Sequence, residues 1–181
     1  MNRSIGRLGR AETAALIVET LAASGIDVVL VGGSCVCVWT NERFGSLDLD
    51  FVDISYARRQ QIANALAKIG FVPAGSTRYF NHPESEWSIE FPSAPLAVGH
   101  EHIGAERIAT LQTSAGTIRL LNPTDTVKDR LLWWYLERDK QCWEQALHIA
   151  RAQQVDWANL EAWHRAEGYA EDFADFRRAS G

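Results

Sequence analysis

Two aspartates separated by a single residue form the pair with the clearest chemical potential in this sequence. Apolar and acidic residues alternate in the segment 47–51, which reads LDLDF. Because alternate side chains of a β-strand face opposite sides, Asp48 and Asp50 would share one face. Two neighbouring carboxylates repel each other in a partly buried site unless water, arginine or a cation offsets their charge. Since Mg²⁺ binds to proteins through one or two carboxylates together with substrate phosphates, this strand is a candidate magnesium site.

A glycine turn upstream strengthens that interpretation, because an Asp-x-Asp strand alone is also typical of a solvated sheet edge. The apolar run 26–31 (IDVVLV) has the composition of a strand buried on both faces, and Gly32, Gly33 and Ser34 interrupt it. Glycines allow backbone N–H groups to approach a ligand closely, and a helix that begins here would favour phosphate. Ser34 could donate its hydroxyl to a phosphate or cap the helix. A purely structural turn would also explain the two glycines.

An α/β framework must position these residues. Helical spacing over 12–23 ends at Gly25, and the apolar run 26–31 follows as a strand. The pattern then predicts, in order, a short helix at 35–41, a strand at 46–52, a helix at 56–69 and short strands at 71–73, 77–81, 86–91, 107–112 and 117–121. Helical patterns fill the rest, at 124–137, 140–152, 157–166 and 169–178. We therefore predict an α/β core over 1–121 and a C-terminal helical region over 122–181, which can pack on the same core.

Composition is that of a soluble globular protein, since 46% of the 181 residues are hydrophobic and can form a sizeable core. No run of about 18 apolar residues occurs, so we expect no membrane span. Three arginines lie in residues 1–10 with no apolar run after them, which excludes a secretory signal and favours a cytoplasmic location. Cys35, Cys37 and Cys142 match neither a disulfide framework nor a zinc site, and Cys35 and Cys37, which lie among apolar residues, are expected to be buried.

The net charge of −5 argues against attraction of a nucleic-acid backbone over the whole surface. A local basic patch could still bind RNA. Candidate residues for such a patch are Arg3, Arg7, Arg10, Arg58 and Arg59. Scattered, solvated arginines are the simpler interpretation.

The glycine turn and the acidic strand together resemble the signature of the DNA polymerase β-like nucleotidyltransferase superfamily. Members carry Gly-Gly or Gly-Ser between a strand and a helix, followed shortly by an Asp-x-Asp strand, as in Gly32-Gly33-Ser34 and Asp48-Leu49-Asp50. The resemblance implies an α/β (α+β) fold with a mixed sheet flanked by helices. Arg43 and Ser46 are similar to the Arg-x-Thr-x-Asp-x-Asp variant of small bacterial members, with one extra residue after Arg43.

A later segment resembles the toxin-like and uncharacterised bacterial branch of this superfamily. Residues 121–130 (LNPTDTVKDR) match a Pro-x-Asp opening that leads to a helical lysine, here Lys128. Lys128 would neutralise the β- or γ-phosphate, although a solvated lysine beside Asp125 or Asp129 explains it equally well. Asp139 lies on the same helical face as Lys128 and is expected to be its ion-pair partner. Gln141 departs from this branch, which has an acid at the corresponding place.

The resemblance also implies a third carboxylate on a neighbouring strand, which completes the metal site and helps to deprotonate the acceptor. In the segment 87–91 (WSIEF), Ser88 and Glu90 alternate with apolar residues, as the two aspartates do. We assign this role to Glu90 rather than to Glu86, which has the same parity but lies at the start of the strand.

Two functions follow. In the first, the chain is a Mg²⁺-dependent nucleotidyltransferase that moves a nucleoside monophosphate from a nucleoside triphosphate to a hydroxyl of a small molecule, a protein or an RNA end. Its predicted metal ligands, for two Mg²⁺ ions, are Asp48, Asp50 and Glu90, and its predicted nucleotide-binding residues are Gly32, Gly33, Ser34, Arg43 and Lys128. In the second, it is a non-catalytic protein of the same fold that binds a nucleotide or a protein partner in a toxin–antitoxin pair. Convergence of the three acids around an open pocket would favour the first.

Overall fold

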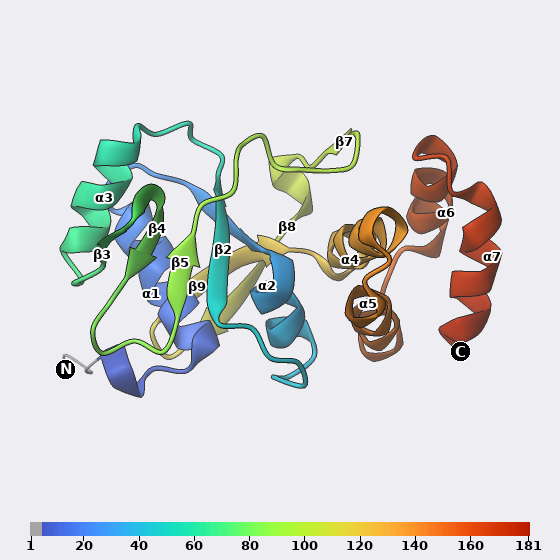
Figure 1. Cartoon of the computed structure of the whole chain (residues 1–181), viewed down its shortest axis with the longest axis horizontal. Helices are drawn as coiled ribbons and strands as arrows, with labels where there is room; N and C mark the ends of the chain where they lie inside the picture. Colours follow the sequence, from blue (N-terminus) through green and yellow to red (C-terminus); the bar gives the residue numbers. More distant parts are fainter. Residues whose placement is uncertain (1–4) are drawn as a thin grey trace.

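The computed structural model in Figure 1 describes residues 5–181, apart from the side chains of residues 76 and 77. Arg3, a candidate for a basic patch, lies outside the described residues. Over the described part of the chain, no helix has the length and apolar character needed to cross a membrane.

Seven strands form one mixed sheet in the order β3-β4-β5-β2-β1-β9-β8. Their bounds are Val28–Val31 (β1), Asp48–Asp53 (β2), Val72–Ala74 (β3), Ser76–Asn81 (β4), Ser88–Glu90 (β5), Ile108–Thr113 (β8) and Gly116–Leu121 (β9). The central strand β2 runs antiparallel to β1 and parallel to β5. A separate two-stranded hairpin consists of β6 (Ala97–Val98) and β7 (Glu101–His102). The sequence pattern did not predict this hairpin, because its strands are too short to show alternation.

Helices cover the sheet and extend beyond it at one end (Figure 1). Their bounds are Arg10–Ala22 (α1), Gly32–Trp39 (α2), Arg59–Ala67 (α3), Pro123–Glu137 (α4), Lys140–Ala152 (α5), Trp157–Ala166 (α6) and Ala170–Ala179 (α7), with 3-10 turns at Ile5–Arg7 and Ala105–Arg107. Side-chain caps explain where α4, α5 and α6 begin. Asn122 accepts a hydrogen bond from the backbone N of Asp125, and Asp139 and Asp156 cap α5 and α6 in the same manner.

The buried apolar side chains of the sheet and of the C-terminal helices belong to one cluster. Leu30 and Phe51 contribute to it from the sheet, and Val127 and Ile149 from α4 and α5. The expected mixed sheet with flanking helices and a helical C-terminal region is therefore confirmed. Cys35 and Cys37 are buried, as predicted, and Cys142 is buried as well; all three are free.

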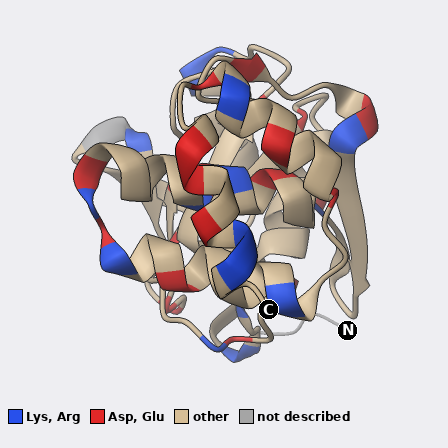
Figure 2. Cartoon of the chain, turned by 90° about the vertical axis from the view of Figure 1, so that its right-hand side faces the viewer, with Lys and Arg blue, Asp and Glu red and all other residues tan. Residues whose placement is uncertain are grey.

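Charges on the face formed by the C-terminal helices are mixed. Figure 2 shows Lys and Arg interspersed with Asp and Glu over this face, without a continuous patch of either sign. Two of the candidate arginines are nevertheless exposed elsewhere, Arg7 and Arg58. The expectation of scattered, solvated arginines is wrong for Arg10, which is buried and donates a hydrogen bond to Ser34.

Candidate active site

Strand pairing brings the predicted acids to one end of the sheet. In the parallel register of β2 and β5, Asp48 pairs with Ser88 and Asp50 with Glu90. On the other side of β2, Asp50 pairs with Val31, the last residue of β1. Helix α2 begins at the next residue, Gly32, which is three residues earlier than the pattern predicted. The glycine turn and the acidic strands therefore meet at the same place.

Gly32 packs directly against the carboxylate of Asp50. Its φ angle is +64°, and a Cβ atom at this position would lie 2.4 Å from Oδ2 of Asp50. Only glycine avoids both the left-handed strain and this collision. Burial, reinforced by the charges of Glu90 and Asp48, raises the pKa of Asp50 from its ordinary value to about 7, and Arg130 partly opposes the shift. Asp50 thus lies in a like-charge cluster that a cation would relieve.

The other two acids are engaged by neighbouring side chains. Asp48 is exposed and accepts a hydrogen bond from the hydroxyl of Ser88. Glu90 forms an ion pair of 2.5 Å with Arg78 and accepts a hydrogen bond of 3.2 Å from the hydroxyl of Tyr79. Within residues 5–181, no three acidic, histidine or cysteine side chains are already arranged as metal ligands. The acids share one site, and rotation of their side chains is needed before all three can bind one ion.

A cavity of about 530 Å³ opens beside Asp50 and Glu90. Its walls come from the glycine turn, the loop before β6 and the helices α4 and α5. The lining residues on these walls include Gly32, Gly33, Pro95, Leu96, Asp129, Arg130, Trp133, Asp139 and Cys142. This volume is within the range of small-molecule binding pockets.

Solved structures share the fold of this chain, whereas no protein-family model and no curated protein matches it. A crystal structure of an antigenic nucleotidyltransferase-like protein from Paracoccidioides brasiliensis is similar over 94% of this chain and 92% of that one, with a TM-score of 0.61 and 13% identity. This chain has a nucleotidyltransferase-like fold.

Two structures of the antibiotic-resistance factor ANT(2'')-Ia share the nucleotidyltransferase-like fold. Its solution structure matches with a TM-score of 0.52 and 10% identity, over 90% of this chain and 94% of that one. Its crystal structure with adenylyl-2''-tobramycin matches with a TM-score of 0.51 and 12% identity, over 91% and 95%. The match covers almost the whole chain, so the C-terminal helices belong to the shared architecture.

Within this fold, the pocket-facing cation of α4 is Arg130. Arg130 is buried, and its Nε and Nη2 atoms lie 3.0 and 2.5 Å from Oδ2 of Asp129. Arg78 is the second arginine that lines the cavity. Sequence reasoning missed both arginines. The spacing of three residues between Arg130 and Trp133 would have indicated that these two side chains share a helical face.

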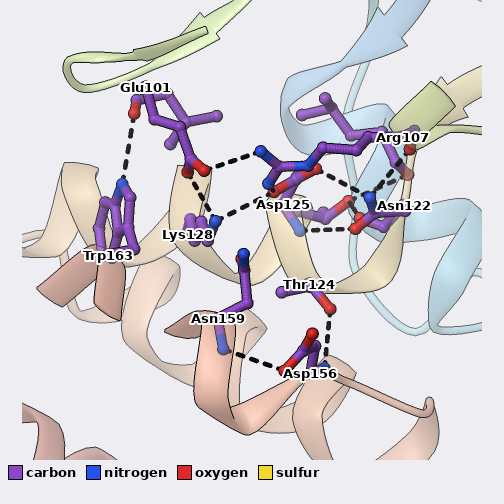
Figure 3. A network of polar contacts seen from close by, with 12 residues as sticks. Glu101, Arg107, Asn122, Thr124, Asp125, Lys128, Asp156, Asn159 and Trp163 are labelled. Carbon is purple, nitrogen blue, oxygen red and sulfur yellow. Dashed lines mark hydrogen bonds and ion pairs between the residues drawn. The ribbon is translucent and has the colours of Figure 1, made fainter. Parts of the chain in front are cut away.

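Lys128 requires a correction, because it points away from the cavity into a buried ionic network (Figure 3). Its side chain is fully buried, and its Nζ atom lies 2.6 Å from Oε2 of Glu101 and 3.3 Å from Oδ1 of Asp125. Arg107 contacts the same two carboxylates. The lysine is therefore buried rather than solvated and does not line the cavity, while its expected neighbour Asp125 is one of its partners. Asp139, its expected partner, instead accepts a hydrogen bond of 2.9 Å from the backbone N of Gln141.

Ser34 and Arg43, which were predicted to bind the nucleotide, do not line the cavity either. Ser34 is fully buried in α2, where its hydroxyl donates to the main-chain carbonyl of Asp48 and accepts from Arg10. It therefore neither caps the helix nor presents its side chain to the cavity. Arg43 is exposed in the connection between α2 and β2 and does not line the cavity. Of the predicted site residues, Gly32, Gly33, Asp50 and Glu90 line the cavity, whereas Asp48 lies on β2 two residues before Asp50 and does not line it.

Proposed function

We propose that this protein is a Mg²⁺-dependent nucleotidyltransferase that transfers a nucleoside monophosphate from a nucleoside triphosphate to a hydroxyl group. The observation that carries the proposal is the register of β2 and β5, which pairs Asp50 with Glu90 beside the glycine turn. Structural similarity to nucleotidyltransferase-like proteins supports it.

The residues present fit a magnesium site. Asp48 and Asp50 offer hard oxygen ligands on one face of β2, and the pKa of Asp50 is raised first by burial and then by the charges of Glu90 and Asp48, which a bound cation would offset. In this proposal Asp48 and Asp50 hold the metal, and Glu90 joins them after it leaves Arg78. When bound, Mg²⁺ neutralises triphosphate charge and lowers the pKa of the acceptor hydroxyl.

The remaining groups position the nucleotide. Backbone N–H groups at Gly32 and Gly33 lie at the start of α2, where a helix favours phosphate. Arg130 supplies positive charge from the opposite wall of the cavity. The acceptor oxygen attacks the α-phosphorus in line, the bond from that phosphorus to the β-phosphate oxygen breaks, and pyrophosphate leaves with the bonding electrons. Glu90 takes the proton of the acceptor hydroxyl. Positioning and charge neutralisation carry the catalysis.

The size of the cavity supports a small-molecule acceptor. A volume of about 530 Å³ suits a small hydroxylated compound beside the triphosphate better than a protein surface or a folded RNA end. The structure of ANT(2'')-Ia with adenylyl-2''-tobramycin adds support, because its ligand is an adenylylated small molecule. Trp133, which is 49% exposed and lines the cavity, is the aromatic surface available to such an acceptor.

The first experiment measures the thermal midpoint of the wild type and of the Asp48→Asn/Asp50→Asn variant with each nucleoside triphosphate, with and without Mg²⁺. A ligand at a hundredfold excess over its Kd stabilises the native state by about 2.7 kcal/mol. The proposal predicts an Mg²⁺-dependent rise in the wild type that is absent in the variant. If no triphosphate shifts the wild type with any divalent metal, the enzymatic function is rejected.

The Arg78–Glu90 ion pair favours a second candidate, a non-catalytic nucleotide-binding module or toxin–antitoxin partner. While this pair persists, Glu90 cannot act as a base. This candidate predicts that a triphosphate binds without requiring Mg²⁺ and that no pyrophosphate is released with any acceptor. An assay of pyrophosphate release with a library of hydroxylated compounds separates the two candidates.

A further inference from the structure

Arg10, on the first turn of α1, is a buried cation outside the cavity. Its side chain is only 3% exposed. Its Nη1 atom donates to Oγ of Ser34 and to the main-chain carbonyl of Ser46, both at 2.8 Å, and its Nε atom lies 2.9 Å from Oε2 of Glu42. Its guanidinium carbon lies 4.3 Å from the ring centroid of Trp87. The guanidinium thus has partners on three separate segments of the chain, namely α2, the connection from α2 to β2, and the residue before β5.

Three of these partners lead directly to Asp48. The hydroxyl of Ser34, which accepts from Arg10, donates to the main-chain carbonyl of Asp48. Ser46 donates to the same carbonyl at 3.1 Å. Trp87 immediately precedes Ser88, whose hydroxyl binds Oδ1 of Asp48. One guanidinium therefore holds the segments that enter both acid-bearing strands, β2 and β5.

We propose that Arg10 is a positioning residue for Asp48, and this inference rests on the proposed function of the acidic strands. Arg10 does not line the cavity, so it acts through Ser34, Ser46 and Trp87 rather than by contact with a ligand. The planar guanidinium donates in several fixed directions while it stacks on an aromatic ring, which a lysine cannot do. Arg10 thereby fixes the start of β2, from which Asp48 projects.

The test compares Arg10→Met and Arg10→Lys with a matched control, Arg119→Met. Arg119 lies on β9, away from the acids, and forms an ion pair of 3.0 Å with the exposed Asp27. Amide hydrogen exchange reports directly on β2, and binding of Mn²⁺, followed by electron paramagnetic resonance, reports on the metal site. Asp48→Asn is the reference for a lost metal ligand.

In Arg10→Met, we expect exchange at Leu49 and Asp50 to rise at least tenfold, with no change in α4 and α5. The Kd for Mn²⁺ should rise at least tenfold, and Arg10→Lys should recover part of both effects. Arg119→Met should match the wild type. Unchanged exchange in β2 would overturn the proposal, and so would an equal rise across the whole sheet and the helices, which would make Arg10 a general stability residue.

The two measurements, hydrogen exchange and Mn²⁺ binding, also distinguish failure of this inference from failure of the proposed function. If the wild type and Asp48→Asn show the same lack of Mn²⁺ and triphosphate binding, the proposed function fails, while hydrogen exchange still decides whether Arg10 fixes β2. If the wild type binds Mn²⁺ and Arg10→Met binds it equally well despite faster exchange, the function stands and the positioning role is rejected.

Discussion

Asp50 on β2 lies opposite Glu90 on β5, and both carboxylates border the same cavity. The two acids are 40 residues apart in the sequence, and the parallel register alone brings them together. Glu90 is bound to Arg78, whereas Asp50 lies against the backbone of Gly32. This difference leads to separate predictions for the residues around the acids.

Asp50 should make the metal-free protein less stable as pH rises. Its pKa is raised from an ordinary value of 3.8 to about 7, first by burial and then by Glu90 and Asp48. Between these values the folded state keeps a proton that the unfolded chain has lost, so the free energy of unfolding falls as pH rises and levels off above the folded pKa. As pH rises from 5 to 8, the free energy of unfolding of Asp50→Asn should therefore increase by about 1–2 kcal/mol relative to that of the wild type. Urea unfolding at both pH values, without metal, measures the difference.

Gly32→Ala should lose both stability and nucleotide binding. Its added methyl group would combine a φ of +64° with a contact 2.4 Å from Oδ2 of Asp50. Gly25→Ala is a matched control, because Gly25 has a φ of +72° and open space around it. The control should cost about 1–2 kcal/mol and keep the Mg²⁺-dependent triphosphate response. Gly32→Ala should cost more and abolish that response. Equal effects in the two variants would show that the contact with Asp50 is unimportant.

The two cations of α4, Lys128 and Arg130, should have opposite phenotypes. Lys128→Met leaves two carboxylates in the buried network short of a partner, so it should cost about 3–5 kcal/mol in the free energy of unfolding. Arg130→Met removes a cation from the cavity wall and should raise the Kd for a triphosphate roughly tenfold or more, the loss of one charge-assisted contact. Calorimetric unfolding and titration of both variants test this. A larger nucleotide defect in a folded Lys128→Met protein would reverse the assignment.

His164 should destabilise the C-terminal helices in mild acid. Burial lowers its pKa from the ordinary value of 6.5, and its hydrogen bond to the carbonyl of Leu160 only partly compensates. The unfolded chain then binds a proton more readily than the folded state, so stability is lost as pH falls below about 6.5. The contact of 3.0 Å with the hydroxyl of Tyr135 fits a neutral ring. Chemical unfolding from pH 7.5 to 5 should show this loss in the wild type and less of it in His164→Gln.

Local patterns were sufficient to predict the parts of the site that lie on single strands. Alternation around Asp48 and Asp50, and the glycines that interrupt the preceding apolar run, depend only on residues close in sequence. The same alternation selected Glu90 once the family resemblance had implied a third carboxylate, although its pairing with Arg78 depends on β4, a strand whose register is set by long-range contacts.

Which side of α4 faces the cavity could not be predicted from the sequence in the same way. Lys128 and Arg130 are two positions apart and therefore point to nearly opposite sides of the helix. Which side faces the cavity depends on the position of the short hairpin that carries Glu101. The hairpin is held there by contacts across the chain, including a hydrogen bond of 3.3 Å from Trp163 to the carbonyl of Val98.

The cavity has two walls of different origin, with the acids and the glycine turn on the sheet and Trp133 and Asp139 on the helical side. Substitutions on the helical wall can alter what enters the cavity while the strands, their register and the turn stay unchanged. Natural variation in such a chain would therefore be tolerated unevenly, with little freedom around Asp50 and much more around Trp133. For a protein engineer, the exposed residues of α4 are the place to begin a library aimed at changing which ligands the cavity binds.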